Sequence, residues 1–160
     1  MTLTGFAPVA DRATHTLILG SFPGVASLTA TQYYAHPRNQ FWRLVGAVIG
    51  EPLHEFSYEE RLQRLLVHRI GLWDVLAACE RQGSLDSAIR NAAANDFDAF
   101  HTRFPALGKV CFNGKTSGRF EAQASAAGYA TLVLPSSSAA NAMLSFDQKL
   151  RVWRDILSTQ

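Results

Sequence analysis

Short apolar runs that end at turn-forming residues are the feature that most restricts the fold of this chain. Each run is stopped by Gly, Asn-Gly or Pro, and the runs are residues 17–19, 110–112 and 131–134. Runs of this kind are typical of strands that are buried on both faces of a parallel sheet. Residues 73–78 form a weaker fourth candidate, which the pattern leaves open between strand and helix.

Amphipathic patterns lie between these runs. Apolar residues recur at helical spacing over residues 41–49, and a second helix is predicted at about 116–126. Capping-box spacings, in which a Ser precedes Glu or Gln by three residues, start further helices after Ser57 and Ser145. This alternation predicts an α/β fold, a three-layer α/β/α sandwich around a central, mostly parallel four-stranded sheet.

Length and composition limit the function classes. With 160 residues and 48% hydrophobic content, the chain is predicted to form a single domain over residues 1–160. A net charge of +2 argues against a broadly basic protein that coats nucleic acid. Cys79 and Cys111 stand alone, so buried reduced thiols are expected. The N-terminal residues lack a signal-peptide pattern and no apolar stretch is long enough to span a membrane, so we expect a cytoplasmic protein.

The loops that follow the three clear strands are the candidate binding region. Ligands of open parallel sheets bind beyond the carboxyl ends of the strands, so these loops should share one rim. The loops are residues 20–39, 112–115 and 134–141. They contain no GxGxxG, complete GxxxxGK[ST], HExxH or GxSxG motif and no dense cluster of His, Asp and Glu. These absences argue against nucleotide triphosphate chemistry, metal-dependent hydrolysis and serine acyl transfer, so no metal is expected.

The rim instead offers amides, hydroxyls and aromatic rings. Asn39 and Asn113 carry the paired donor and acceptor that suit a base edge, and Phe22 and Tyr34 offer flat apolar faces. Lys115 and the backbone amides of the Ser-rich loop are suited to phosphates. This combination fits a pocket for a base that is extruded from DNA.

The segments GSFPG, AHPRNQFW, FNGK and LPSSSAAN together resemble the uracil-DNA glycosylase superfamily, most of all its hypoxanthine-DNA glycosylase branch. The resemblance covers nearly the whole chain. It implies a monofunctional enzyme of base excision repair that flips a deaminated base out of double-stranded DNA and hydrolyses its N-glycosidic bond. Hypoxanthine is expected as the first substrate and uracil as the second, for a monomer that needs no cofactor.

The resemblance also implies a set of site residues. Asn39 matches the critical amide of the hypoxanthine branch and is the predicted catalytic residue, and Tyr34 matches a ring that stacks on the flipped base. The predicted substrate-binding residues are Gly20, Ser21, Phe22, Pro23, Tyr34 and Asn113. The predicted DNA-binding residues are Lys115, Ser136, Ser137, Ser138 and Asn141.

Two departures from the family pattern keep other functions open. Phe22 stands where mismatch-specific relatives have an Asn that orients water, and Leu134 stands where relatives begin the last loop with His or Asn. The bulky wedge of the relatives is also replaced here by Ser138 or Ala140, with Asn141 or Met143 as substitutes. The alternatives are a mismatch-specific uracil glycosylase, a binding module for damaged bases without catalysis, and an unrelated enzyme acting on a small nucleoside.

Structural roles compete with several of these functional ones. Asn39 precedes an amphipathic run and could cap a helix, and Asn113-Gly114 is a common turn pair. The serines at 136–138 could also cap a helix, and adjacent rings such as Tyr33 and Tyr34 point to opposite sides of an extended segment. For Asp74, at a possible strand end, the sequence favours surface solvation or a cap.

Overall fold

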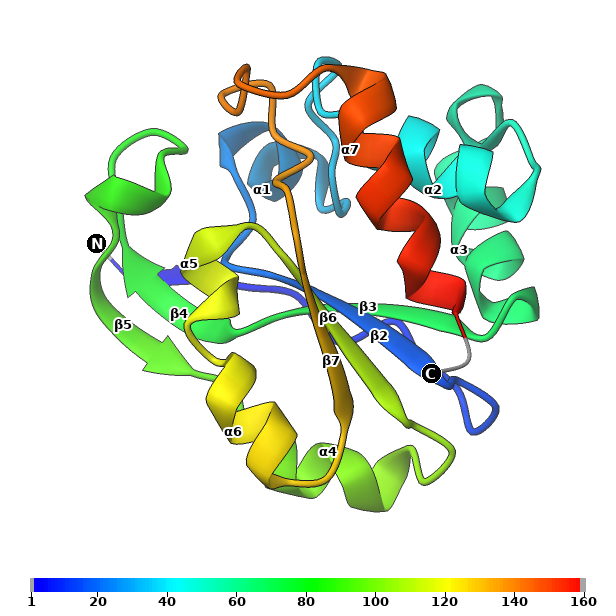
Figure 1. Cartoon of the computed structure of the whole chain (residues 1–160). Helices are drawn as coiled ribbons and strands as arrows, with labels where there is room; N and C mark the ends of the chain where they lie inside the picture. Colours follow the sequence, from blue (N-terminus) through cyan, green and yellow to red (C-terminus); the bar gives the residue numbers. More distant parts are fainter. Residues whose placement is uncertain (1, 159–160) are drawn as a thin grey trace.

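A four-stranded parallel sheet forms the centre of the computed structural model, which describes residues 2–158 (Figure 1). Its strands are β2 (Thr16–Gly20), β3 (Ile70–Asp74), β6 (Lys109–Asn113) and β7 (Ala130–Leu134), in the order β3-β2-β6-β7. The three predicted strands are confirmed. The fourth candidate is divided, because its first residues complete β3 and its last residues begin a strand of another sheet.

That second sheet is small and antiparallel. It contains β1 (Leu3–Thr4), β4 (Leu76–Glu80) and β5 (Arg90–Ala94), in the order β1-β4-β5. Only Val75 separates β3 from β4, and the N–H groups of Val75 and Leu76 donate to the carbonyls of Gly20 and Ser21 at 2.8 and 3.1 Å. The chain thus passes from one sheet to the other directly beside the end of β2.

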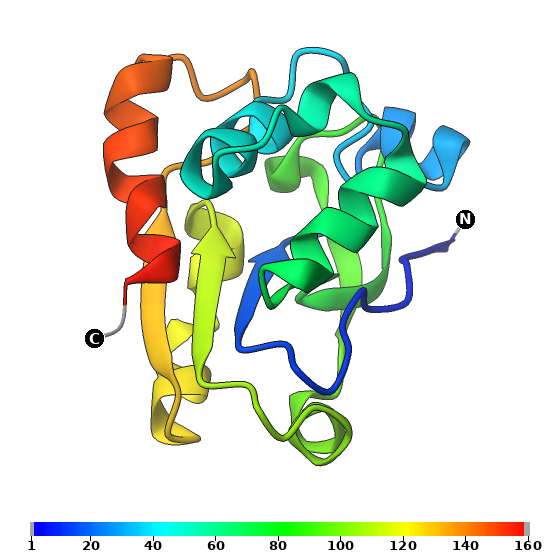
Figure 2. The same cartoon turned by 90° about the vertical axis from the view of Figure 1, so that its right-hand side faces the viewer.

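Helices cover both faces of the central sheet, which confirms the three layers (Figures 1 and 2). One face carries α2 (Phe41–Ile49), α3 (Tyr58–Val67) and α7 (Phe146–Trp153). The other carries α4 (Phe97–Arg103), α6 (Glu121–Ala126) and the small sheet. Shorter elements are α1 (Val25–Ala30), α5 (Lys115–Gly118) and the 3-10 turns η1 (Leu53–Glu55), η2 (Asp86–Ala88) and η3 (Arg154–Leu157).

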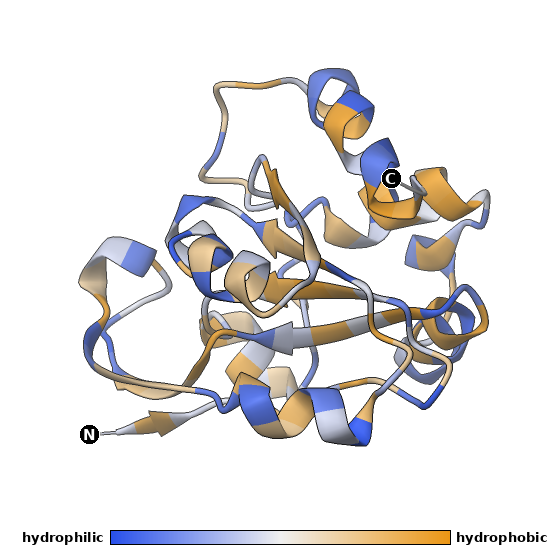
Figure 3. Cartoon of the chain, turned by 60° about the horizontal axis from the view of Figure 1, so that its bottom comes forward, coloured by the Kyte–Doolittle hydropathy of each residue, from blue (hydrophilic) through white to orange (hydrophobic). Residues whose placement is uncertain are grey.

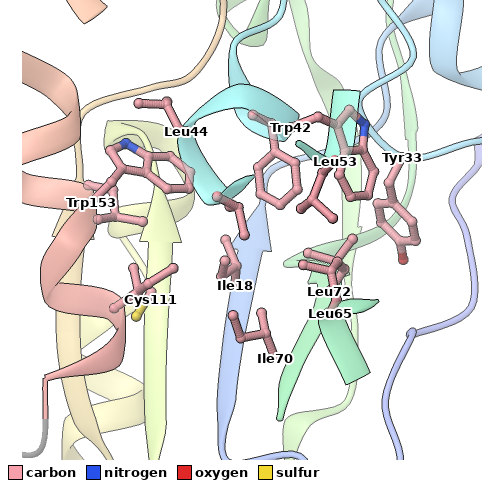
Figure 4. Packing of buried hydrophobic residues seen from close by; sticks show 14 residues of the cluster. Ile18, Tyr33, Trp42, Leu44, Leu53, Leu65, Ile70, Leu72, Cys111 and Trp153 are labelled. Carbon is pink, nitrogen blue, oxygen red and sulfur yellow. The ribbon is translucent and has the colours of Figure 1, made fainter. Parts of the chain in front are cut away.

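The strand β2 divides its side chains between two hydrophobic cores. Ile18 packs under α2, α3 and α7, whereas Leu17 and Leu19 face the opposite layer. Figure 4 shows Ile18 and Cys111 of the sheet facing Leu44 and Trp153 of the helices. Figure 3 shows the corresponding pattern of hydropathy, with mostly apolar central strands and helices that combine apolar and polar residues.

Local signals confirm most of the predicted helices. The Ser57 hydroxyl accepts from the Glu60 N–H, Ser145 and Gln148 form a complete capping box, and Gly50 ends α2 with φ of 76°. The single helix predicted at 116–126 is wrong, because α5 and α6 are separate. After Gly118 the backbone bonds shorten to the i to i−3 type, since the Arg119 and Phe120 N–H groups donate to the Thr116 and Ser117 carbonyls, and this tighter turn ends α5.

Two further expectations concern the cysteines and the membrane. Cys79 and Cys111 are both buried and free, as predicted. Within residues 2–158, no helix has the length and apolar character that a membrane span requires.

Candidate functional site

A cavity of about 1020 Å³ opens at the carboxyl ends of the central strands. All the site residues predicted from the sequence line it, and they come from each of the three predicted loops. The chain after β7 and the segment after β2 meet in the upper half of Figure 1, around the mouth of this cavity. The sheet therefore brings the predicted residues together in one place.

Asn39 has both a structural contact and a free functional group. Its Oδ1 accepts from the Phe41 N–H at 3.0 Å, at the start of α2. The neighbouring Gln40 N–H donates to the Ser137 carbonyl at 2.9 Å, which ties this segment to the Ser-rich loop. Within residues 2–158, the side-chain Nδ2 of Asn39 has no hydrogen-bond partner, so its donor function remains available to a ligand in the cavity.

Asn113 connects the three loops through its side-chain amide. Its Oδ1 accepts from the Ser137 N–H at 2.9 Å, and its Nδ2 donates to the Ser137 Oγ at 2.9 Å and to the Tyr34 hydroxyl at 3.4 Å. Ser137 is 1% exposed. Because protein groups occupy this amide, Asn113 lines the cavity mainly as a support of its wall.

The aromatic residues of the first loop have different positions. Tyr33 is buried in the core and donates its hydroxyl proton to the Ala7 carbonyl at 2.8 Å. Tyr34, with φ of 55°, stacks on Phe41 at 3.9 Å between ring centroids and lines the cavity. Phe22 is 6% exposed and forms part of the opposite core, with the Arg81 guanidinium 5.5 Å from its ring centre. Both tyrosines line the cavity, but the Tyr33 hydroxyl is held in the core, whereas the Tyr34 hydroxyl lies beside Asn113.

The Ser-rich loop is folded by its own hydrogen bonds. The Ser136 and Ser138 hydroxyls accept from the Ser138 and Ala140 N–H groups, and the Asn141 Nδ2 donates to the Ser136 carbonyl. The next helix begins only after Ser145, so these serines do not cap a helix. Lys115 lies at the edge of the cavity with its side chain exposed.

Helix α7 anchors this loop from the core side. The Trp153 Nε1 donates to the Pro135 carbonyl at 2.9 Å. Lys149, only 1% exposed, donates to the Gln40 Oε1 at 2.8 Å and to the Ser138 carbonyl at 3.5 Å. Burial lowers the pKa of this lysine. Lys149 thus joins the segment before α2 to the Ser-rich loop, a role that the sequence analysis missed.

Asp74 is the main correction to the sequence analysis of the site. Its side chain lies at the end of β3, level with Gly20 in the sheet register, and is 5% exposed instead of solvated. It does not cap a helix, and its Oδ2 is buried without a hydrogen-bond partner in residues 2–158. Burial and the nearby carboxylate of Asp86 raise the pKa of Asp74 to about 7, against the lowering effect of Arg81.

Gly20 makes room for this carboxyl group. A Cβ atom at Gly20 would lie 2.6 Å from the Asp74 Oδ1 and 3.1 Å from the Tyr34 hydroxyl. Asp86, a second acid that the sequence analysis missed, lies in the connection between β4 and β5 and accepts from the Ser21 hydroxyl at 2.7 Å. The cavity wall therefore carries two acids besides the predicted amides, the buried Asp74 and the exposed Asp86.

Comparison with known proteins identifies the family. The model of the Uracil DNA glycosylase superfamily matches residues 7–157. The chain belongs to the uracil DNA glycosylase superfamily. Two hypoxanthine DNA glycosylases, from Methanosarcina acetivorans and Methanosarcina barkeri, are each 48% identical over 141 residues, covering 88% of this chain and 89% of each relative.

A solved structure agrees with the whole architecture of this glycosylase. The solution NMR structure of a candidate uracil DNA glycosylase from Methanosarcina acetivorans has a TM-score of 0.87 and 44% identity, and covers 99% of this chain and 100% of the other. The family predicted from the four sequence segments is thus confirmed, together with the fold.

The support provided by Asn113 is open to a stability test in this glycosylase. We expect Asn113→Ala to lower the free energy of unfolding by about 1–3 kcal/mol, because the buried Ser137 N–H loses its acceptor. Urea unfolding measures this value. Asn141→Ala is the matched control, since it removes one bond of 3.3 Å on the half-buried rim. Equal effects of the two substitutions would show that Asn113 gives the loops no special support.

Proposed function

We propose that this DNA glycosylase releases hypoxanthine from deoxyinosine in double-stranded DNA, with deoxyuridine as its second substrate. The observation that carries the proposal is the convergence of the four family segments on one open cavity, where the Asn39 Nδ2 is free. The names of the two relatives at 48% identity support hypoxanthine as the preferred base. We further propose that the protein acts as a cytoplasmic monomer, without metal or cofactor.

The reaction creates charge that the cavity is suited to stabilise. Hydrolysis of the N-glycosidic bond leaves an oxocarbenium-like sugar and a base that departs with negative charge. Donors aimed at the base act mainly in the transition state, where that charge develops. Asn39 would donate from Nδ2 to the base or hold the attacking water, while Tyr34 and Phe22 provide apolar walls.

Contacts with the DNA backbone are expected at the outer rim. Lys115 is exposed there, and the half-buried Ser136 and Ser138 lie beside it with hydroxyls that accept bonds within the loop and could donate their protons to a phosphate. Ser137 is the weakest of these candidates, since it is buried against Asn113. Met143 is 90% exposed at the cavity mouth, so it is the better candidate to fill the space that the flipped base leaves. Asn141 is less suited, since its amide is held by the Ser136 carbonyl.

A binding module without catalysis is the second candidate. Two positions that are polar in relatives carry apolar side chains here, Phe22 at 6% exposure and Leu134 at 2%. Neither can orient water or stabilise an anion. A binding module would hold a flipped base in the same cavity without releasing it from the DNA.

Single-turnover cleavage of matched duplexes tests the proposal. Three duplexes differ at one position only, which carries deoxyinosine, deoxyuridine or an undamaged base. The released base and the binding of the duplex are both measured. We expect hypoxanthine to be released fastest, uracil more slowly and no normal base. Faster release of uracil would favour the mismatch-specific alternative, and binding without release of either base would favour the binding module.

A further inference from the structure

Asp74 is the polar side chain in the cavity whose burial is least compensated by hydrogen bonds. Its carboxyl group shares the space above Gly20 with the Tyr34 hydroxyl, and its Oδ2 is fully enclosed without a partner in residues 2–158. Buried polar groups in folded proteins are almost always hydrogen-bonded, so an exception calls for an explanation. Asp74 also lines the cavity and its Oδ1 is not enclosed, so a ligand there could form a hydrogen bond with the carboxyl group through Oδ1.

The surroundings favour the neutral form of this carboxyl group. Asp86, on η2, faces it with a second acidic group, while Arg81 beyond β4 acts in the opposite direction. Tyr34 is held as a phenol, since burial and Asp74 raise its pKa. Within residues 2–158, the other titratable groups on the cavity wall are Tyr33, His36 and Lys115. Bound DNA would bring phosphate charges close to the cavity, and these would also oppose ionisation of Asp74.

The charge of the departing base decides which protonation state of the Asp74 carboxyl group would assist the reaction. An ionised carboxylate would repel a base that leaves as an anion, whereas a neutral carboxyl group can donate its O–H to that base. Carboxylic acids that are kept neutral in apolar sites are known to donate hydrogen bonds in this way. Hypoxanthine presents acceptors of the guanine type at O6 and N7, to which such a donor could bind.

We propose that Asp74 is a second catalytic residue, which donates a hydrogen bond from its neutral carboxyl group to the departing base. The inference rests on the proposed glycosylase function. Asn39 and Asp74 reach the cavity from different segments, the loop before α2 and the end of β3. The base would therefore be held by donors from two separate elements, and it would give the Asp74 carboxyl group, through the accessible Oδ1, a hydrogen bond that residues 2–158 do not provide.

The test is the pH dependence of single-turnover excision from a deoxyinosine duplex, between about pH 5.5 and about pH 9. Asp74→Asn keeps the size and a donor but cannot ionise, Asp74→Ala removes the group, and Asp86→Asn removes the neighbouring charge. For the wild type we expect the rate to fall about tenfold per pH unit once Asp74 ionises. Asp74→Ala should lose about 100-fold or more below that point.

Asp74→Asn and Asp86→Asn show whether Asp74 acts as a hydrogen-bond donor or as a general base. We expect Asp74→Asn to keep most of the wild-type rate in acid and to lack the alkaline fall, so that it exceeds the wild type at high pH. Asp86→Asn should move the fall to lower pH, because its charge no longer opposes ionisation of Asp74. Thermal unfolding and duplex binding confirm that each variant is folded and occupied by DNA.

Two results would overturn the inference while leaving the proposed function intact. An Asp74→Asn variant as inactive as Asp74→Ala would mean that an ionised carboxylate activates water. An Asp74→Ala variant within about threefold of the wild type would exclude Asp74 from the reaction. If the wild type itself releases no base from any duplex, the proposed function fails first and the inference falls with it.

Discussion

Asn39→Ala is expected to slow the single-turnover release of hypoxanthine about 100-fold to 1000-fold. The reason is the loss of the Nδ2 donor, which has no hydrogen-bond partner in residues 2–158 and lines the cavity. Since the effect concerns the transition state, duplex binding should change far less than the cleavage rate. The measurement compares both quantities on the same deoxyinosine duplex.

The contact between the Asn39 Oδ1 and the Phe41 N–H requires a control. This bond lies just before the helix, whose N-cap is Gln40, and its loss costs about 0.5–1.5 kcal/mol and could reduce activity by loosening the start of α2. Asn39→Ser keeps an oxygen that can accept from the Phe41 N–H but has no amide donor, so it should restore the stability lost in the alanine variant without restoring its rate. Recovery of activity in the serine variant, or a loss below about threefold in the alanine variant, would reduce Asn39 to a structural residue.

The second large effect is a change in the pH dependence of stability in Asp74→Asn. The pKa of Asp74 is about 7 in the folded protein and about 3.9 in an unfolded chain. Its contribution to the free energy of unfolding is therefore fully present below about pH 4 and is lost as the pH rises to about 7. The loss amounts to at most about 4 kcal/mol, and it should be absent in the asparagine variant.

Urea unfolding at several pH values measures this difference. Other groups also make the stability depend on pH, among them Glu51, whose pKa is lowered by Arg64 and His68. They cancel when the variant is compared with the wild type at each pH. Glu55→Gln, a change at an exposed acid, is the control and should follow the wild-type curve. Parallel curves for Asp74→Asn and the wild type would show that the carboxyl group ionises normally in the folded state.

Much of the central layer could be predicted from the sequence because its signals are local. Residues 41–49 carry a complete amphipathic pattern, and Ser145 with Gln148 forms the capping box that their spacing indicates. The strands around Ile18 and Cys111 are short apolar runs with turn residues directly after them. The rule that parallel strands present their carboxyl ends to ligands then placed the loops at one rim.

The small sheet and the acids depend on contacts that leave no local pattern. Strand β5 has the sequence RNAAA and is exposed throughout, so neither propensity nor alternation marks it as a strand. Asp86 follows no motif, and only its contact with Ser21 places it at the site. The sequence does carry local signals for Asp74 and Lys149. Asp74 directly follows an apolar run, as Gly20 and Asn113 do, and Lys149 lies one turn before Trp153 on the buried side of α7.

The central place of β2 has a consequence for protein synthesis. This entirely buried strand pairs with β3 on one edge and with β6 on the other, and both partners follow it far along the chain. A nascent chain therefore carries an apolar strand with open edges until β6 has been translated, and such edges promote association with other chains. The central position of β2, which sets Gly20 beside Asp74, thus also determines when the chain is most prone to aggregate. This period is the interval before β6 has been synthesised.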